Sequence, residues 1–207
     1  MPEVDRTMRI TADGKVYRKG KKKYANKDSY DGEFLDGMRH GKGILTYYRG
    51  DRYVGDFQKD LFHGFGTLTF APFKDELTGQ NFIGKRYEGT WIDGKYDGKG
   101  LYFSGNGLTY SGSFSKGLYH GEGTLKFPNG DYYVGEWGRG KANGKMSIKY
   151  ASRETYVGHM MSGKYSGAGI LTFANKLGFY DGQWVRGKQH GTGTSEPVTT
   201  SPGTVTT

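Results

Sequence analysis

One tyrosine-led pattern recurs along almost the whole chain, and it constrains the fold more than any other feature. Its clearest copy, residues 110–132, reads YSGSFSKGLYHGEGTLKFPNGDY, and the pattern starts again at the next residue. Seven tyrosines open full copies at intervals of 23, 34, 23, 23, 23 and 24 residues: Tyr30, Tyr53, Tyr87, Tyr110, Tyr133, Tyr156 and Tyr180. A fixed period in this range is the signature of a repeat architecture.

Within each copy, apolar and polar residues alternate in a way that predicts strands. In the first copy, Tyr30 and Phe34 fall on one face of a strand while Asp31 and Glu33 fall on the other. The dipeptide 36–37, Asp-Gly, is a turn signal. Each copy is therefore expected to form a β-hairpin, and the stacked hairpins to form an all-β, elongated antiparallel sheet.

Glycine is the commonest residue, and its placement is ordered. Of 37 glycines, 30 fall at five fixed places of the repeat, which argues against a disordered low-complexity chain. A glycine leaves a slot over which an aromatic ring from a neighbouring strand can lie. We expect Gly41, Gly43 and Leu45 to share the aromatic face. One hairpin is marginal in water, whereas seven stacked hairpins can be stable.

Composition narrows the class of protein. The chain has no cysteine, which excludes a disulfide framework, a thiolate metal site and a cysteine nucleophile. The first residues lack the apolar run of a signal peptide and no segment approaches transmembrane length, so a cytoplasmic protein is expected. The net charge is +9, of which +5 falls in residues 1–29. A basic arm of this kind can attract acidic partners, phosphoinositide surfaces or nucleic acid, and the alternative is a tail that only aids solubility.

The predicted organisation follows the repeat. Residues 1–19 are a basic arm; residues 20–193 are the array, with a half repeat at 20–29 and full repeats from residues 30, 53, 87, 110, 133, 156 and 180; residues 194–207, rich in Ser, Thr and Pro, are expected to be disordered. The second copy carries 11 extra residues within Ala71–Arg86. We expect this insert to lengthen a hairpin or to pack locally, with a binding role as the alternative. The fifth and sixth copies are eroded, since Met146 replaces a glycine and Met160 an aromatic residue.

The histidines and glycine pairs that suggest chemistry are explained by the repeat. Four histidines stand in register: His40, His63, His120 and His190. Histidines of adjacent repeats would lie roughly 9–10 Å apart, whereas zinc holds nitrogens at about 2.0–2.1 Å, so they cannot share an ion. We expect each histidine to bond the turn of its own hairpin. No copy is singled out as an active site, so we expect no catalytic residue, metal or cofactor, and hence no enzyme.

The octet from His63 resembles an RNA-recognition strand motif. The same octet recurs from His40 and His120, so the repeat accounts for it, and nucleic acid is not among the expected partners.

The full pattern, Tyr-x-Gly-x-(Phe/Trp)-x-x-Gly-x-x-His-Gly-x-Gly, resembles the MORN-repeat family (membrane occupation and recognition nexus). The resemblance covers about residues 20–193, with Asp60 in place of the turn glycine and Asp97 in place of the histidine. It implies a single-layered, twisted antiparallel sheet whose aromatic face lines a groove. It also implies a stand-alone repeat protein without an appended catalytic domain.

The first functional hypothesis is a protein-interaction scaffold, cytoskeletal or ciliary/flagellar, that binds a partner segment such as a helix, or a second copy, in the aromatic groove. The predicted protein-binding residues are the inward aromatics: Tyr30, Phe34, Tyr53, Phe57, Tyr87, Trp91, Tyr110, Phe114, Tyr133, Trp137, Tyr156, Tyr180 and Trp184. The alternative for the same residues is a plain core role.

A second hypothesis is peripheral binding to anionic phospholipid membranes. The predicted contact is four lysines in the basic lead-in: Lys19, Lys21, Lys22 and Lys23. Each lysine near such a surface contributes about 1 kcal/mol. Self-association as a homo-oligomer is a third alternative, because the end strands of an open sheet are unpaired.

Overall fold

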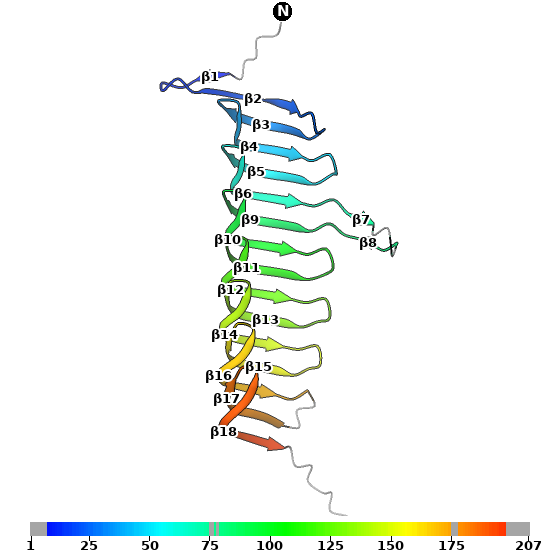
Figure 1. Cartoon of the computed structure of the whole chain (residues 1–207), viewed down its shortest axis with the longest axis vertical. Coiled ribbons are helices and arrows are strands. Elements are labelled where there is room, and N and C mark those ends of the chain that lie inside the picture. Colours follow the sequence, from blue (N-terminus) through cyan, green and yellow to red (C-terminus); the bar gives the residue numbers. More distant parts are fainter. Residues whose placement is uncertain (1–7, 75–76, 78, 175–177, 198–207) are drawn as a thin grey trace, which may run out of the picture. The chain divides into compact units, whose positions relative to one another are not determined.

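The computed structural model describes residues 8–74, 77, 79–174 and 178–197, and its regular elements there are all strands (Figure 1). The strands are β1 (Arg9–Ile10), β2 (Val16–Lys23), β3 (Ser29–Leu35), β4 (Met38–Thr46), β5 (Arg52–Gln58), β6 (Leu61–Thr69), β7 (Phe73–Lys74), β8 (Asn81–Phe82), β9 (Arg86–Ile92), β10 (Lys95–Phe103), β11 (Thr109–Ser115), β12 (Leu118–Lys126), β13 (Tyr132–Gly138), β14 (Lys141–Lys149), β15 (Thr155–Met161), β16 (Lys164–Thr172), β17 (Gly178–Val185) and β18 (Lys188–Pro197). Nothing in the described ranges is a helix of the length and hydrophobicity needed to cross a bilayer.

Sixteen strands form one open antiparallel sheet in which neighbours follow the order of the sequence, and β7 pairs only with β8. The expected single-layered, all-β sheet of hairpins is therefore confirmed. The chain divides into two compact units, Met1–Leu118 (unit 1) and Tyr119–Thr207 (unit 2), and each is described by itself.

Each hairpin turns through two residues with positive φ. In the first, Asp36 and Gly37 have φ of 50° and 81°, and Leu35 pairs with Met38 across the turn. This is the geometry of a two-residue turn whose twist matches that of the strands. Asp60, which replaces the glycine of the motif, keeps the same geometry at φ 67°. Its carboxylate accepts hydrogen bonds from the backbone N and the Nε of Arg39, at 2.9 and 3.0 Å, in the preceding hairpin.

In the repeats that start at residues 30, 53, 87, 156 and 180, the opening tyrosine lies over a glycine of the same hairpin. A Cβ added to Gly43 would lie 2.3 Å from the hydroxyl oxygen of Tyr30, so only glycine fits beneath the ring. The Tyr30 hydroxyl donates to the Glu33 carbonyl oxygen at 2.8 Å. The ring makes edge-to-face contacts with Phe34 at 4.9 Å and with Phe57 of the next repeat at 5.0 Å. Such pairs contribute about 0.5–1.5 kcal/mol each beyond area burial, so the rings tie one repeat to the next.

A bulge lies between the turn and the glycine position in the hairpins that start at residues 30, 53, 87, 133, 156 and 180. In the first repeat, Gly32 pairs with Gly43 but the adjacent Glu33 pairs with His40, so two residues of β4 have no partner on β3. Gly41 sits in this bulge at φ 55°, and a Cβ there would meet the Glu33 carboxylate rather than a ring. The expectation that Gly41 and Gly43 share the aromatic face is therefore wrong, because the bulge turns Gly41 to the other side.

The fifth repeat shows what happens when the slot is filled. Met146 stands where other repeats have the glycine, and its side chain is buried. Tyr133 is only half-buried, and its ring meets those of Phe127 and Tyr150 edge-to-face at 5.1 and 5.8 Å. The Tyr150 hydroxyl in turn lies 2.5 Å from that of Tyr165. The methionine thus takes the place of the tyrosine ring in the core.

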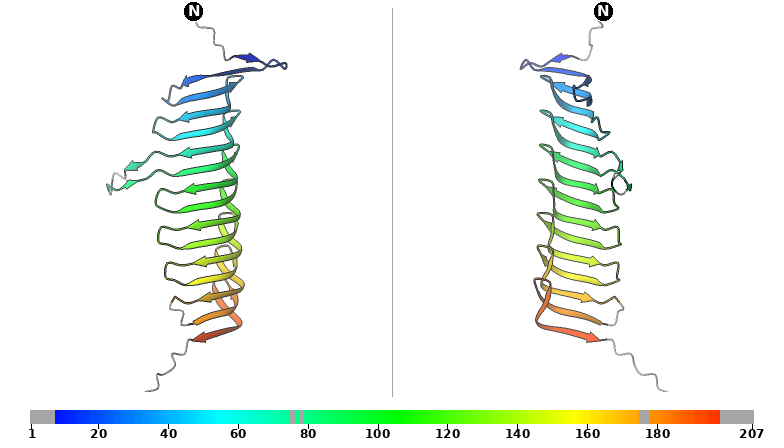
Figure 2. Two further views of the ribbon diagram at one scale, coloured as in Figure 1. Left: turned by 180° about the vertical axis from the view of Figure 1, so that it is seen from behind. Right: turned by 45° about the vertical axis from the view of Figure 1, so that its right-hand side comes forward.

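The insert lengthens a hairpin, which is one of the two structures that we expected for it. Its strands β7 and β8 form a two-stranded ribbon between β6 and β9 that projects beyond the neighbouring turns of unit 1 (Figure 2). The side chains of Phe73, Leu77 and Ile83 are exposed, so the ribbon adds little core.

Two predicted boundaries differ from the strands. The expected arm 1–19 ends inside β2, because β2 pairs with β3 from Tyr17 onward. The expected tail begins at residue 194, whereas β18 stays paired with β17 as far as Pro197. The rest of that tail lies outside the described residues.

Candidate functional site

Of the thirteen aromatic residues predicted to bind a partner, twelve form part of the core. Tyr133 is half-buried, and the other twelve are buried: Tyr30, Phe34, Tyr53, Phe57, Tyr87, Trp91, Tyr110, Phe114, Trp137, Tyr156, Tyr180 and Trp184. Burial raises the pKa of Tyr156 to about 12, since a charged phenolate would be poorly solvated there. This burial favours the alternative core role.

The polar atoms of these rings are satisfied within the chain. The indole Nε1 of Trp91 donates to the Gly66 carbonyl oxygen at 3.0 Å, and that of Trp184 donates to Gly169 at 2.8 Å. Both bonds join a repeat to the one before it. Partner binding by these residues stays a prediction, and it would require the core to open.

The four lysines predicted to bind lipid lie on both faces of β2. Successive residues of a strand point to opposite faces, so Lys19, Lys21 and Lys23 share one face and Lys22 lies on the other. Arg18, on the aromatic face, places its guanidinium carbon 4.7 Å from the centroid of the Phe34 ring. All four lysines are exposed, but only three of them can contact one flat surface together.

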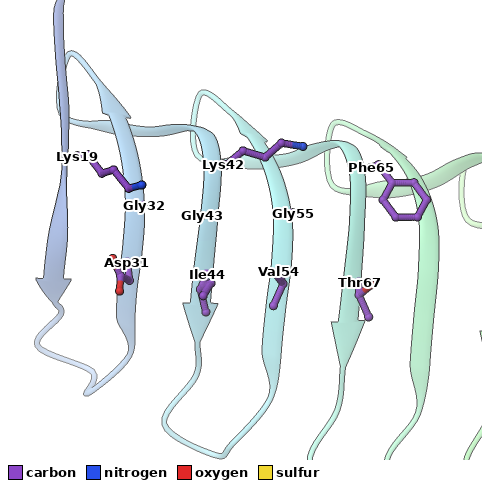
Figure 3. Close-up of a pocket in the computed structure, with 10 residues that line it drawn as sticks. All are labelled: Lys19, Asp31, Gly32, Lys42, Gly43, Ile44, Val54, Gly55, Phe65 and Thr67. Carbon is purple, nitrogen blue, oxygen red and sulfur yellow. The ribbon is translucent and has the colours of Figure 1, made fainter. Parts of the chain in front are cut away.

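The sheet face opposite the tyrosine rings, which we call the open face, carries a groove in unit 1. This first groove has a volume of about 610 Å³ and crosses β2 to β6. Its lining residues are Lys19, Asp31, Gly32, Lys42, Gly43, Ile44, Val54, Gly55, Phe65 and Thr67. Figure 3 shows two rows of side chains from successive strands, one with Lys19, Lys42 and Phe65, and the other with Asp31, Ile44, Val54 and Thr67. Three glycines leave bare backbone in its floor.

The centre of the first groove is apolar. Ile44 lies directly opposite Val54, and Val54 directly opposite Thr67. Phe65, on the adjoining row, leaves 58% of its surface exposed. An outward phenylalanine beside other exposed apolar side chains is the kind of surface that binds partners.

Ion pairs flank this apolar centre. Lys42 Nζ lies 2.6 Å from Asp56 Oδ1, and Lys21 Nζ lies 3.4 Å from Asp31 Oδ2. The lysine side chains are largely exposed, so each pair contributes about 0–1 kcal/mol to stability. The Asp56 carboxylate also accepts a hydrogen bond from the Phe65 backbone N at 3.1 Å, which holds the bulge that presents Phe65.

Unit 2 carries a second groove at the same places of the repeat, also of about 610 Å³. Its lining residues are Glu122, Gly135, Glu136, Lys145, Met146, Ser147, Val157, Gly158, His159, Ala168, Gly169, Ile170 and Asp181. Val157 and Ile170 lie opposite each other and are exposed. Glu122 lies opposite Glu136, and two carboxylates in that arrangement repel each other.

The side chain at the histidine position reaches the turn of the following hairpin. Asp97 Oδ2 accepts a hydrogen bond from the Lys116 backbone N at 3.0 Å. His63 Nδ1 lies 3.9 Å from Asp93 Oδ1, again in the next hairpin. The expectation that this residue bonds its own turn is therefore wrong, because each turn packs on the hairpin before it. In the described ranges, no three ligand-type side chains cluster in a way that suits a metal ion.

Sequence reasoning missed the groove residues Ile44, Val54 and Phe65. Their signal was present, since they are apolar residues at positions of the repeat that alternate away from the tyrosines. They were overlooked because isolated outward hydrophobic residues are common on protein surfaces. Only the cross-strand register places them side by side.

The family assignment follows from these repeats. The family model described as MORN repeat matches residues 30–52, 53–72, 87–109, 110–132, 133–145, 156–177 and 180–196, which together make up more than half of the chain. The chain therefore belongs to the MORN-repeat family, whose repeat is a non-catalytic type.

One solved structure illustrates a distant likeness. The chain is similar to the TCP domain of SAS-4 (dCPAP) of Drosophila melanogaster, solved in complex with a proline-rich motif of Ana2 (dSTIL). The identity is 15%, the TM-score is 0.40, and the match covers 84% of this chain and 88% of that one. No curated protein matches the sequence.

Proposed function

We propose that this protein is a non-enzymatic scaffold that binds a segment of another protein on its open face, with the first groove as the contact. The observation that carries this proposal is the exposed apolar centre formed by Val54 and Phe65. Exposed apolar groups in a groove, with charged residues around them, are typical of anchor sites for partner side chains. A cytoskeletal, ciliary or flagellar setting in the cytoplasm is part of the proposal and follows from the family resemblance.

The test is affinity capture from cells, comparing the wild-type chain with the double variant Val54→Asp, Phe65→Asp. We expect the variant to lose the proteins that the wild type retains, because two charges would replace the apolar centre. The matched control is Leu61→Asp, which changes an exposed residue of β6 outside the groove. Circular dichroism checks that all variants keep their strands. Equal capture by the double variant and the control would contradict the proposal.

A second candidate is peripheral binding to anionic lipid. The observation that favours it is the shared, exposed face of Lys19, Lys21 and Lys23. We expect the substitution of these three lysines by glutamine to abolish sedimentation of the protein with phosphatidylserine vesicles, and Lys22→Gln to have less effect. Electrostatic binding of this kind weakens as salt is raised. Sedimentation that is unchanged by salt and by the triple variant would contradict this candidate.

A further inference from the structure

We infer that the first groove selects an acidic partner segment that carries regularly spaced apolar side chains. The inference rests on the proposed function and adds the chemistry of the partner. It is drawn from the charges that flank the apolar centre and from the spacing of the strands beneath it.

The apolar centre belongs to a row of side chains that crosses the open face of unit 1. Each member lies directly opposite the next on the neighbouring strand, in the order Asp31, Ile44, Val54, Thr67, Glu88 and Leu101. Leu101 is exposed, as Val54 is. Apolar side chains therefore recur along the direction that runs across the strands.

Cations lie on both sides of this row. Between the bulges and the connecting turns, the open face of β2 to β11 carries a net charge of +3. Its seven cations are Lys19, Lys21, Lys23, Lys42, Arg52, Arg86 and Lys99, and its four carboxylates are Asp31, Glu33, Asp56 and Glu88. A positive face of this kind attracts a negatively charged partner and orients it during encounter.

Several of these cations are available to a partner. Lys21, Lys42 and Arg86 pair with carboxylates of the same face. In contrast, Lys23, Arg52 and Lys99 are exposed and contact no carboxylate within the described residues. Arg52 lies on the connecting-turn side of the apolar row and Lys99 on the bulge side, so acidic groups on both edges of a bound segment would find a partner.

The strand spacing suits a regular segment laid across the sheet. Neighbouring strands lie about 4.8 Å apart, and one turn of an α-helix rises about 5.4 Å. Apolar side chains one turn apart on a helix would therefore meet side chains on successive strands, such as those of Ile44 and Val54. A helix with apolar residues on one face and acids beside them matches both the apolar row and its flanks.

The same observations favour a protein segment over a membrane. Three of the seven cations are already paired with the chain's own carboxylates, which weakens attraction to a diffuse anionic surface. A partner that supplies both apolar anchors and a few placed acids uses the whole groove.

The experiment uses the full chain and defined probes. The first probe is a synthetic amphipathic helix of about 20 residues, with leucines at positions i, i+3, i+4 and i+7 and glutamates elsewhere. The second replaces every glutamate with lysine, and the third scrambles the glutamate peptide. Phosphatidylserine vesicles are the fourth. Binding is measured by fluorescence anisotropy for the peptides and by sedimentation for the vesicles, at low and high salt.

We expect the glutamate peptide to bind at least tenfold more tightly than the lysine and scrambled peptides, and less tightly at high salt. The double variant Arg52→Glu, Lys99→Glu should weaken it at least tenfold. The matched control, Lys59→Glu with Lys95→Glu, changes the net charge equally at the hairpin turns and should leave binding within about twofold.

Each other outcome overturns the inference in a distinct way. The glutamate and lysine peptides could bind equally well, with both losing binding in the double variant Val54→Asp, Phe65→Asp. That result would support the proposed function but contradict the preference for an acidic segment. Binding to vesicles but not to the glutamate peptide would assign the cations to lipid. Binding to no probe would overturn the acidic segment, while capture from cells would still decide the proposed function.

Discussion

The first and second grooves occupy the same places of the repeat in two units, yet their charges differ. Lys19 in the first groove lies opposite Glu33, whereas its equivalent in the second, Glu122, lies opposite Glu136. Beneath the first groove the rings of Tyr30 and Tyr53 fill glycine slots, and beneath the second groove Tyr156 does so, while Met146 is buried at the glycine position of the fifth repeat. The inward positions are constrained by a slot that only glycine leaves open, whereas the outward positions meet solvent and are free to vary. Differences between repeats on the open face are therefore where this protein specifies a partner.

The largest expected effect on stability comes from removing the tyrosine ring that lies over the glycine in each hairpin. Tyr53→Ala in unit 1 and Tyr156→Ala in unit 2 should each lower the free energy of unfolding by about 3–5 kcal/mol, because each ring is fully buried. Urea denaturation followed by tryptophan fluorescence measures this change. Tyr48→Ala, at a residue with 66% of its surface exposed, is the control and should change stability by less than about 0.5 kcal/mol. A small loss in only one unit would show that the two units are not built alike.

Adding a methyl group at the glycine that lies beneath the tyrosine ring should have the next largest effect on stability. A Cβ at Gly66 would lie 2.2 Å from Tyr53, and one at Gly169 would lie 2.4 Å from Tyr156. Gly66→Ala and Gly169→Ala should each lower the free energy of unfolding by about 1–3 kcal/mol, since the ring or the strand must move. Gly20→Ala is the control, because a Cβ there meets nothing within 4 Å. Unchanged stability in both slot variants would contradict the steric role of these glycines.

Alkaline pH should destabilise both units through their tyrosines. Burial raises the pKa of Tyr96 in unit 1 and of Tyr156 in unit 2 to about 12, from an ordinary value of 10.0. The folded state therefore favours the neutral phenol, so the stability is fully present below pH 10 and is lost as the pH rises toward 12. At pH 11 the loss is about 1.4 kcal/mol for each fully shifted tyrosine. Melting temperatures measured from pH 9 to 12 test this, and a flat profile above pH 10 would contradict it.

The smallest expected effect concerns the charges that distinguish the grooves. Glu122→Lys removes a repulsion across the strands and should raise the free energy of unfolding by about 0.2–1 kcal/mol at low salt. Lys19→Glu creates the corresponding repulsion with Glu33 and should lower stability by a similar amount. Both changes in the free energy of unfolding should be smaller at high salt, because salt screens the interaction between exposed charges. Shifts of the same sign in the two variants would mean that the grooves do not differ as described.

Much of the fold was predictable because the repeat states it seven times. The hairpin, the Asp36-Gly37 turn and the ring over Gly43 all follow from local rules of strands, turns and glycine sterics. The lengthened hairpin at Ala71–Arg86 followed from the extra residues. These features depend on neighbours in sequence or on the adjacent strand, and a repeated pattern reveals both.

The candidate site was less predictable because exposure is a property of the assembled sheet. The aromatic residues were expected to line a groove, but rings from adjacent repeats cover one another and leave most of them buried. The bulge moves Gly41 to the opposite face, and no single residue announces it. Met146 was recognised as an eroded glycine, but its consequence for Tyr133 depends on the space available in the core.

By itself, then, the sequence determined the family, the hairpin period and the pairing of the opening tyrosines with glycines wherever the repeat keeps that glycine, because these depend on spacing and on the absence of a Cβ. Only the tertiary structure decided which face is closed and which is open. Strand register brings Ile44, Val54 and Phe65 together from separate strands, and packing between repeats hides the tyrosines. Which side chains meet solvent is settled by neighbours in space, and the linear pattern does not contain that information.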